Sequence, residues 1–272
     1  MTVDRNEVAR HRAEMPEGTH AILDTRSLAT DHRRLAELLA PGMSVLDVGC
    51  GTGAITRGIA DAVGSEALVV GIDVTAGFIE EATRRHAGVR HLTFALADVY
   101  TFATERRFDV VTTARVLQWL NRPDAAVRAM TSLARPGGRV VVLDYSHEKI
   151  AWDPTPPASM RRFYAAFLAW RAEAGMDNLV ADHLEPMLEG AGLEAIHVSA
   201  QHETAERGDP DFARRAGIWA DVAATRGHQM VADGAVDEPT RAAAEREYRE
   251  WVATKAERQT MYLLAVDGAR RA

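Results

Sequence analysis

Val45-Leu46-Asp47-Val48-Gly49-Cys50-Gly51-Thr52-Gly53 is the stretch of sequence that decides the fold. Its first half is an apolar run typical of a buried strand, and its second half contains three alternating glycines. The residues that follow, through about Val63, have the composition of a helix. A strand, a glycine loop and a helix in this order favour an open α/β sheet with a ligand bound over the loop.

The glycine loop also indicates the kind of ligand. Glycine is needed where the backbone approaches a ligand closely or takes a positive φ, and the following helix offers free N–H groups to a carboxylate. The spacing is Gly-x-Gly-x-Gly, and Asp47 stands two residues before the first glycine. Because the Asp47 carboxylate would repel phosphates, the loop favours a ligand with a free amine over a pyrophosphate.

Short apolar runs alternate with amphipathic stretches on both sides of this loop, which predicts a mainly parallel sheet covered by helices. We expect an α/β fold with a doubly wound, seven-stranded, mainly parallel Rossmann-like sheet. The predicted strands are Ser44–Val48, Ala67–Asp73, His91–Ala97, Phe108–Thr113, Arg139–Tyr145, Leu193–His202 and Gln259–Val266.

The rhythm of strands and helices breaks after Tyr145, where a loop with three prolines begins. We expect helical insertions to form a cap over the carboxyl edge of the sheet, where open α/β sheets bind ligands. The predicted segments are an N-terminal helical cap segment (1–40), the cofactor-binding core (41–145), a cap insertion (146–180), a core helix with strand six (181–204), a second cap insertion (205–257), and the last strand and tail (258–272).

Acidic residues end the two strands that follow the glycine loop. Asp73 closes the second strand and is placed to accept hydrogen bonds from both hydroxyls of a ribose. Asp98 closes the third strand and is placed to accept a bond from an adenine amino group. A helix cap or a turn former is the alternative interpretation of each residue taken alone.

Taken with Phe108-Asp109-Val110-Val111 and Leu133-Ala134-Arg135-Pro136-Gly137-Gly138, these segments resemble the class I S-adenosylmethionine-dependent methyltransferase family over roughly residues 40–145. The resemblance implies S-adenosyl-L-methionine as the cofactor, with the glycine loop at its methionine half and the acidic residues at its ribose and adenine. Arg26 is a candidate to close over the cofactor carboxylate, with an ordinary surface arginine as the alternative. The residues that we expect at the cofactor are Arg26, Asp47, Gly49, Cys50, Gly51, Thr52, Gly53, Asp73, Val74, Ala97, Asp98, Val99, Ala114 and Arg115.

The segment Ala114–Leu120 and the inserted helices are more loosely similar to the branch that methylates quinone precursors and other small metabolites. This similarity implies an apolar or aromatic small-molecule acceptor and a place in secondary metabolism. An aromatic group in the expected cap is consistent with such an acceptor, although helix packing alone also explains it. Its members are Trp152, Phe163, Tyr164, Phe167 and Trp170.

Transfer from a sulfonium depends mainly on alignment, with a general base needed if the acceptor must lose a proton. The candidate catalytic residues are His147 and Tyr145, which stand at the end of the fifth strand, with His20 and His183 as weaker candidates. A structural, hydrogen-bonded role is the alternative for each residue. Acidic residues do not cluster after strands four and five, so we predict no metal.

The overall composition excludes several classes of protein. The formal net charge of −7 and the scattered basic pairs argue against nucleic-acid binding. Cys50 is the single cysteine, so an internal disulfide is impossible. The polar start and the lack of a long apolar run favour a cytoplasmic protein without a membrane span. If the chain forms a homodimer, we expect the cap helices to provide its surface.

Two alternative functions follow from the same motifs. Tyr145 and Lys149 match the Tyr-x-x-x-Lys spacing of short-chain reductases, but Tyr145 ends a strand, so the two residues would not share a helical turn. The glycine spacing is also wrong for a nicotinamide dehydrogenase. The second alternative is a protein that binds S-adenosylmethionine without transferring methyl, as a binding module or a pericyclase-like enzyme.

Overall fold

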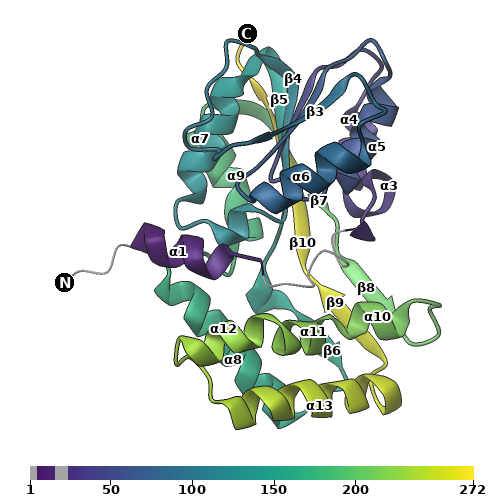
Figure 1. The fold of residues 1–272 in the computed structure, drawn as a ribbon, viewed down its shortest axis with the longest axis vertical. Coiled ribbons are helices and arrows are strands. Elements are labelled where there is room, and N and C mark those ends of the chain that lie inside the picture. The colour runs from purple at the N-terminus through teal and green to yellow at the C-terminus, as the bar shows by residue number, and fades with distance from the viewer. Residues whose placement is uncertain (1–4, 16–23) are drawn as a thin grey trace.

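A seven-stranded sheet, covered by helices, is the centre of the larger of two bodies in the computed structural model, which describes residues 5–15 and 24–272 (Figure 1). The strand order is β3-β2-β1-β4-β5-β10-β7, and β10 runs antiparallel to both of its neighbours. The expected seven-stranded, mainly parallel sheet is therefore confirmed. Its strands are β1 (Val45–Val48), β2 (Val69–Asp73), β3 (Leu92–Leu96), β4 (Phe108–Ala114), β5 (Ala134–Tyr145), β7 (Leu193–Ala200) and β10 (Leu263–Arg270).

Helices cover both faces of this sheet because successive strand residues point to opposite sides. On one face, Val45 packs with Leu28, Leu35 and Ile59, and on the other face Leu46 packs in a cluster with α7 and α9. The helices of the sheet layers are α3 (Leu28–Asp31), α4 (Arg33–Leu38), α5 (Ala54–Val63), α6 (Ala76–Arg85), α7 (Pro123–Leu133) and α9 (Val180–Gly190).

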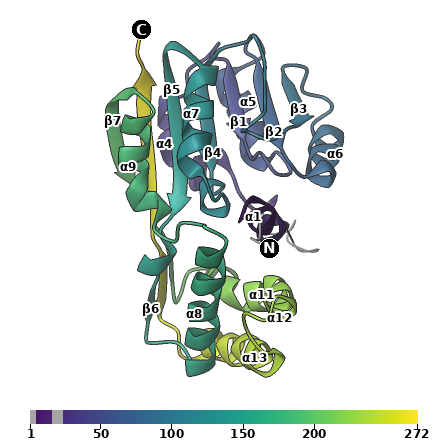
Figure 2. The same cartoon turned by 90° about the vertical axis from the view of Figure 1, so that its left-hand side faces the viewer.

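A second body, which we call the helical lobe, lies beyond the carboxyl ends of the parallel strands (Figures 1 and 2). It contains a three-stranded sheet in the order β6-β9-β8 and a cluster of buried aromatic and apolar side chains. Its elements are β6 (Ala151–Asp153), α8 (Ala158–Glu173), β8 (Glu203–Glu206), α10 (Phe212–Ala216), α11 (Ile218–Ala224), α12 (Arg226–Ala232), α13 (Glu238–Thr254) and β9 (Arg258–Met261).

The structure differs from the sequence expectation in three places. The expected strand Gln259–Val266 is two strands, because β9 belongs to the sheet of the helical lobe and β10 to the main sheet. The small sheet was not predicted. Residues 28–38, expected in a cap, instead pack against the main sheet through Leu28 and Leu35. Helix α1 (Arg5–Ala13) lies between the main sheet and the helical lobe (Figures 1 and 2).

His32, between α3 and α4, is a buried histidine held against the sheet. Its Nε2 lies 3.0 Å from the Thr112 hydroxyl, which itself donates to the carbonyl oxygen of Val141. Burial and the nearby charge of Arg115 lower the pKa of His32 to about 3. Because the unfolded chain binds a proton here near its ordinary pKa of about 6.5, acid favours unfolding.

We predict that His32 makes the free energy of unfolding depend on pH below about 6.5. Below about pH 6.5, the free energy of unfolding of the wild type should fall, relative to that of His32→Gln, by about 1.4 kcal/mol for each pH unit. This slope should continue until the pH approaches the pKa of His32 in the folded protein. Urea unfolding between pH 5 and 8 measures the difference. His197→Gln, which removes an exposed histidine, is the control. If the free energy of unfolding changed with pH in the same way in the wild type and in His32→Gln, the prediction would be contradicted.

Candidate functional site

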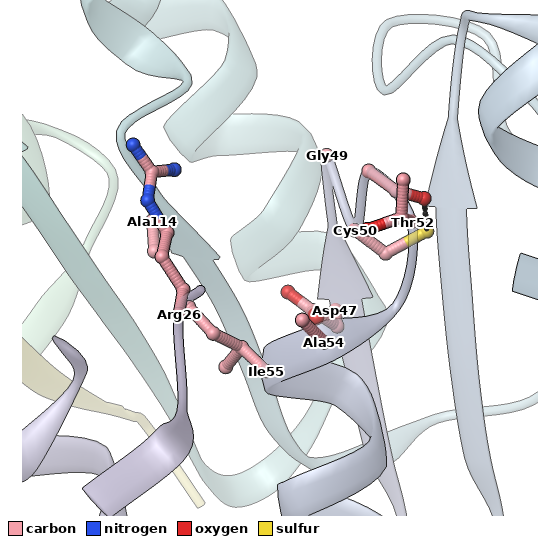
Figure 3. Close-up of a pocket in the computed structure, with 9 residues that line it drawn as sticks. Arg26, Asp47, Gly49, Cys50, Thr52, Ala54, Ile55 and Ala114 are labelled. Carbon is pink, nitrogen blue, oxygen red and sulfur yellow. Dashed lines mark hydrogen bonds between the residues drawn. The ribbon is translucent and has the colours of Figure 1, made fainter. Parts of the chain in front are cut away.

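A pocket lies at the carboxyl edge of the main sheet, above the end of β1 (Figure 3). Seven of the residues expected at the cofactor line it, together with the first two residues of α5. In Figure 3, Arg26 and Ala114 stand on one side and Cys50 and Thr52 on the other. The lining residues are Arg26, Asp47, Gly49, Cys50, Gly51, Thr52, Ala54, Ile55 and Ala114.

The glycine loop has the backbone that its sequence predicts. Gly49, Gly51 and Gly53 all have positive φ values, of 75°, 53° and 80°. A Cβ atom on Gly49 would lie 2.2 Å from Cγ2 of Val116, which leaves no room for a side chain. Gly53 is the left-handed N-cap of α5, so the free N–H groups of this helix begin at the pocket.

Asp47 is a buried carboxyl group in the pocket. Its Oδ2 accepts a hydrogen bond of 2.7 Å from the Thr56 hydroxyl. Burial raises the pKa of Asp47 to about 7; the Thr56 bond opposes this shift, and the charge of Asp73 adds to it. A cationic ligand beside Asp47 would therefore stabilise its ionised form.

Asp73 and Asp98 lie at strand ends, as expected, and both bind backbone amides. Asp73 accepts from the N–H groups of Gly51, at 3.0 Å, and Thr75, at 2.9 Å. Asp98 accepts from the N–H of Tyr100 at 2.9 Å and pairs with Arg10 of α1 at 3.1 Å. The turn-forming role is thus present for both carboxylates, and Asp73 also orients the glycine loop.

The other residues expected at the cofactor differ in their surroundings. The side chain of Val74 is exposed, whereas Val99 packs in the core cluster next to α7. The N–H of Ala97 donates to the carbonyl oxygen of Asp73 at 2.9 Å. Cys50 is buried, and this burial raises the pKa of its thiol. The thiol therefore stays protonated, which suits a small packing residue.

Arg115 follows Ala114 at the end of β4, but its side chain turns towards the helical lobe. Its Nε donates to the Tyr145 hydroxyl at 3.0 Å, and its Nη2 contacts Glu203 of β8. The Tyr145 hydroxyl donates to the other oxygen of Glu203 at 3.1 Å. Burial and the Glu203 charge raise the pKa of Tyr145 to about 12, so Tyr145 keeps its proton near neutral pH.

His147 is buried two residues beyond the end of β5, at the start of the short helix His147–Lys149. Its Nε2 lies 2.6 Å from Oε1 of Gln118, whose Nε2 donates to the carbonyl oxygen of Arg115. Because the Gln118 oxygen only accepts, the His147 Nε2 carries the proton and Nδ1 has a free lone pair. Within the described residues Nδ1 has no hydrogen-bond partner. Burial, then the charge of Arg171, lowers the pKa of His147, which is therefore neutral near pH 7.

The aromatic side chains expected in the cap mostly pack inside the helical lobe, which agrees with the alternative interpretation that helix packing alone explains them. Phe163, Phe167 and Trp170 are almost fully buried among one another and their neighbours. Trp219, which sequence reasoning missed, lies edge-on to Phe167 at a ring-centroid distance of 5.3 Å. His183 is half exposed and pairs with Asp177, and His20 lies outside the described residues.

Other residues near the site were not predicted from the sequence, and only some of them could have been. Ala54 and Ile55 follow the glycine loop directly, so their place at the pocket was predictable. Asp31 and Glu203 reach Arg115 from 84 and 88 residues away in the chain, and no local pattern predicts such a contact.

Residues 5–15 and 24–272 contain neither a cluster of metal ligands nor a helix suited to cross a membrane. No group of three or more His, Cys, Asp or Glu side chains is arranged to hold a metal ion. No helix in this part of the chain combines the length and the apolar composition that a membrane crossing requires.

Residues 39–189, more than half of the chain, match a family described as a methyltransferase domain. A ubiquinone/menaquinone biosynthesis C-methyltransferase UbiE from Burkholderia vietnamiensis is 33% identical in an alignment of 172 positions, and the match covers 57% of this chain and 69% of the relative. An uncharacterized 37.1 kDa protein in transposon TN4556 of Streptomyces fradiae is 34% identical over 125 residues, which are 46% of this chain and 36% of the relative. The chain thus spans about a third of the second relative.

Two solved structures share the fold. Phosphoethanolamine N-methyltransferase 2 of Haemonchus contortus has a TM-score of 0.56 at 16% identity, covering 90% of this chain and 52% of that protein. The [4+2]-cyclase SpnF has a TM-score of 0.54 at 19% identity, and the match covers 98% of this chain and 91% of SpnF. At these identities the likeness shows the fold alone. With the family match and the sequence relatives, the chain belongs to the methyltransferase-domain family, among the class I S-adenosylmethionine-dependent methyltransferases.

Proposed function

We propose that this methyltransferase transfers the methyl group of S-adenosylmethionine to an apolar or aromatic small molecule, without a metal ion. The observation that carries the proposal is the packed aromatic cluster at the carboxyl end of β5, the strand that pairs with β4 beside the pocket residue Ala114. Tyr145 stacks on His147 at 5.5 Å between ring centroids, and His147 meets Trp219 at 6.0 Å. The quinone-precursor methyltransferases among its relatives are consistent with such an acceptor.

The chemistry of the pocket side chains fits the amino-acid end of the cofactor. Asp47 is suited to the ammonium group, and Arg26 and the N-terminus of α5 to the carboxylate. Asp73 and Asp98 remain the proposed partners of the ribose and the adenine. Since Arg10 of α1 pairs with one oxygen of Asp98, an adenine amino group would share this carboxylate with Arg10.

The chain's residues act mainly by positioning. When bound, S-adenosylmethionine supplies a methyl group already activated on sulfur, so alignment of the acceptor accounts for much of the rate. The apolar neighbours of His147 exclude water, and its free Nδ1 lone pair accepts a proton from an acceptor that must ionise. Gln118 holds the ring in the tautomer that leaves Nδ1 unprotonated.

A second candidate function keeps the cofactor and omits methyl transfer. The fold shared with the [4+2]-cyclase SpnF is consistent with it, although that likeness concerns the fold alone. The cytoplasmic location, the role in secondary metabolism and the homodimer all stay predictions.

Turnover separates these two functions. We predict that the protein, given methyl-labelled S-adenosylmethionine and a metabolite extract of the source cells, moves label into an apolar small-molecule fraction and releases S-adenosylhomocysteine. Thin-layer separation and scintillation counting measure the label. If the cofactor binds and no label appears above a protein-free control, the non-transferring function is favoured.

The pKa of Asp47 predicts how cofactor affinity depends on pH. Because an ammonium group binds the ionised carboxylate, affinity should fall as the pH falls through about 7, by up to about tenfold per unit. Calorimetric titration with S-adenosylhomocysteine between pH 6 and 8 measures it.

Asp47→Asn should bind S-adenosylhomocysteine at least about tenfold more weakly than the wild type does at pH 8, and its affinity should no longer depend on pH in this range. Asp61→Asn, on the exposed end of the same α5 helix, should behave as the wild type. An unchanged pH profile in Asp47→Asn would show that another group titrates.

His147 predicts a different pH profile for the transfer step at saturating cofactor. Because its lowered pKa keeps the imidazole neutral, the rate should show no fall centred near pH 6.5 as the solution is acidified. His147→Gln should reduce labelling by about 10²-fold or more while S-adenosylhomocysteine still binds. His183→Gln, which changes a half-exposed histidine, is the matched control. Full labelling by His147→Gln would remove His147 from the mechanism.

A further inference from the structure

Arg115 holds an unusual position at the edge of the pocket. It follows Ala114, which lines the pocket, and has a φ of 62°. This left-handed conformation is uncommon for a residue with a side chain, so the surrounding contacts must hold it. The side chain is only 3% exposed although it carries a guanidinium. A charge buried to this extent requires partners.

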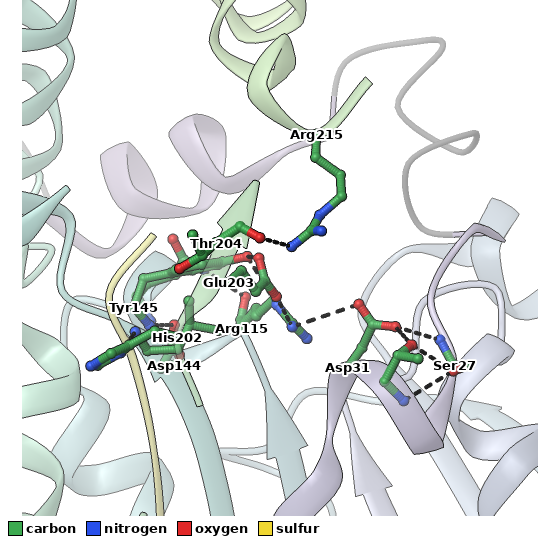
Figure 4. Close-up of polar contacts among 12 residues, drawn as sticks. Ser27, Asp31, Arg115, Asp144, Tyr145, His202, Glu203, Thr204 and Arg215 are labelled. Atoms are coloured by element: carbon green, nitrogen blue, oxygen red, sulfur yellow. Dashed lines mark hydrogen bonds and ion pairs between the residues drawn. The ribbon is translucent and has the colours of Figure 1, made fainter. Parts of the chain in front are cut away.

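The partners of Arg115 contact two of the three guanidinium nitrogens. Nε donates to Tyr145, and Nη2 contacts Glu203 and lies 3.9 Å from Asp31. Figure 4 shows Arg115 between the Glu203–Thr204 segment and the Asp31–Ser27 segment. Among residues 5–15 and 24–272, the buried Nη1 has no hydrogen-bond partner. Its two N–H donors are therefore held in fixed positions by the bonds of the other nitrogens.

Glu203 and Asp31 offset part of the Arg115 charge, and a second cation lies nearby. The guanidinium of Arg26, which lines the same pocket, is close enough that burial and the Arg115 charge together lower the pKa of Arg26. Two neighbouring cations attract an anionic oxygen more strongly than either would alone. A carboxylate is also the group that matches the planar guanidinium.

Aromatic rings pack directly beside Arg115. Its guanidinium lies 5.7 Å from the centre of the Tyr145 ring, which stacks on His147. His147 in turn meets Phe167 edge-on, at 5.6 Å between ring centroids. Buried donors next to aromatic rings suit a ligand with an anionic oxygen at one end and an apolar or aromatic body.

We propose that Arg115 Nη1 binds an anionic oxygen of the methyl acceptor, so that the acceptors are aromatic or apolar acids. The anionic oxygen belongs either to a carboxylate or to an ionised ring hydroxyl. The proposal rests on the proposed function, since it names the acceptor class for the same site. Glu203 competes with the acceptor for the Arg115 charge.

Titration calorimetry with the protein loaded with S-adenosylhomocysteine tests this proposal. Benzoate is compared with neutral benzamide, and 4-nitrophenol is compared above and below its own ionisation. Each anion should bind at least about tenfold more tightly than its neutral counterpart, the advantage of a charge-assisted hydrogen bond. Preference for benzoate identifies a carboxylate site, and preference for nitrophenolate identifies a ring-hydroxyl site.

Two variants separate binding by Arg115 from its structural role. Arg115→Gln should lose the tenfold anion preference, whereas Arg128→Gln, which changes an exposed arginine on α7, should keep it. Glu203→Gln should bind the anion more tightly, by up to about tenfold, because the competing carboxylate is gone. A merely structural Arg115–Glu203 pair would not produce this gain, so Glu203→Gln remains informative if Arg115→Gln fails to fold.

The outcomes distinguish this proposal from the function on which it rests. Equal binding of anions and neutral probes by the wild type would overturn the Arg115 site, as would unchanged or weaker anion binding in Glu203→Gln. Transfer of label only to neutral acceptors would also overturn it while leaving the methyltransferase function intact. Failure of S-adenosylhomocysteine to bind would instead count against the proposed function.

Discussion

The turn that leaves β1 is the constraint on which the pocket depends. Gly49 packs so closely against Val116 that no Cβ fits, and Val116 follows β4. Gly51, two residues later, donates its N–H to Asp73 at the end of β2. The loop is therefore fixed to the ends of both strands that flank β1. Because these contacts require left-handed backbone, the alternating glycines are a structural requirement before any ligand binds.

The helical lobe is positioned over this edge by charged and aromatic contacts. Trp119 lies between the guanidinium groups of Arg171 and Arg226, at 4.8 and 4.3 Å from its ring. Arg171 also donates to the carbonyl oxygen of Gln118 at 2.8 Å. Such stacked guanidinium contacts are directional and strongest where water is excluded. The lobe thus fixes the same segment that orients His147, which links its packing to the proposed chemistry.

The sequence predicts the parts of the molecule that depend on local pattern. The seven strands, the glycine loop and the pocket position of Asp47 follow from periodicity and from the conformational freedom of glycine. Glu203 and Asp31 could not be predicted, because their contacts with Arg115 join distant segments. Arg115 itself was expected beside the cofactor, but the direction of its side chain depends on those two carboxylates. The small sheet of the helical lobe was missed because its strands have only three or four residues.

The direction of the Arg115 side chain also resolves an electrostatic conflict. Two unit charges of the same sign about 5 Å apart repel by roughly 3 kcal/mol at an effective dielectric constant of about 20. If the Arg115 guanidinium pointed towards a bound sulfonium, it would therefore weaken binding of that cation. Glu203 and Tyr145 instead draw the Arg115 side chain towards the helical lobe, while its neighbour Ala114 lines the pocket. This arrangement keeps the positive charge of Arg115 at the edge of the site, where the proposed anionic acceptor would meet it, and Asp31 and Glu203 offset that charge.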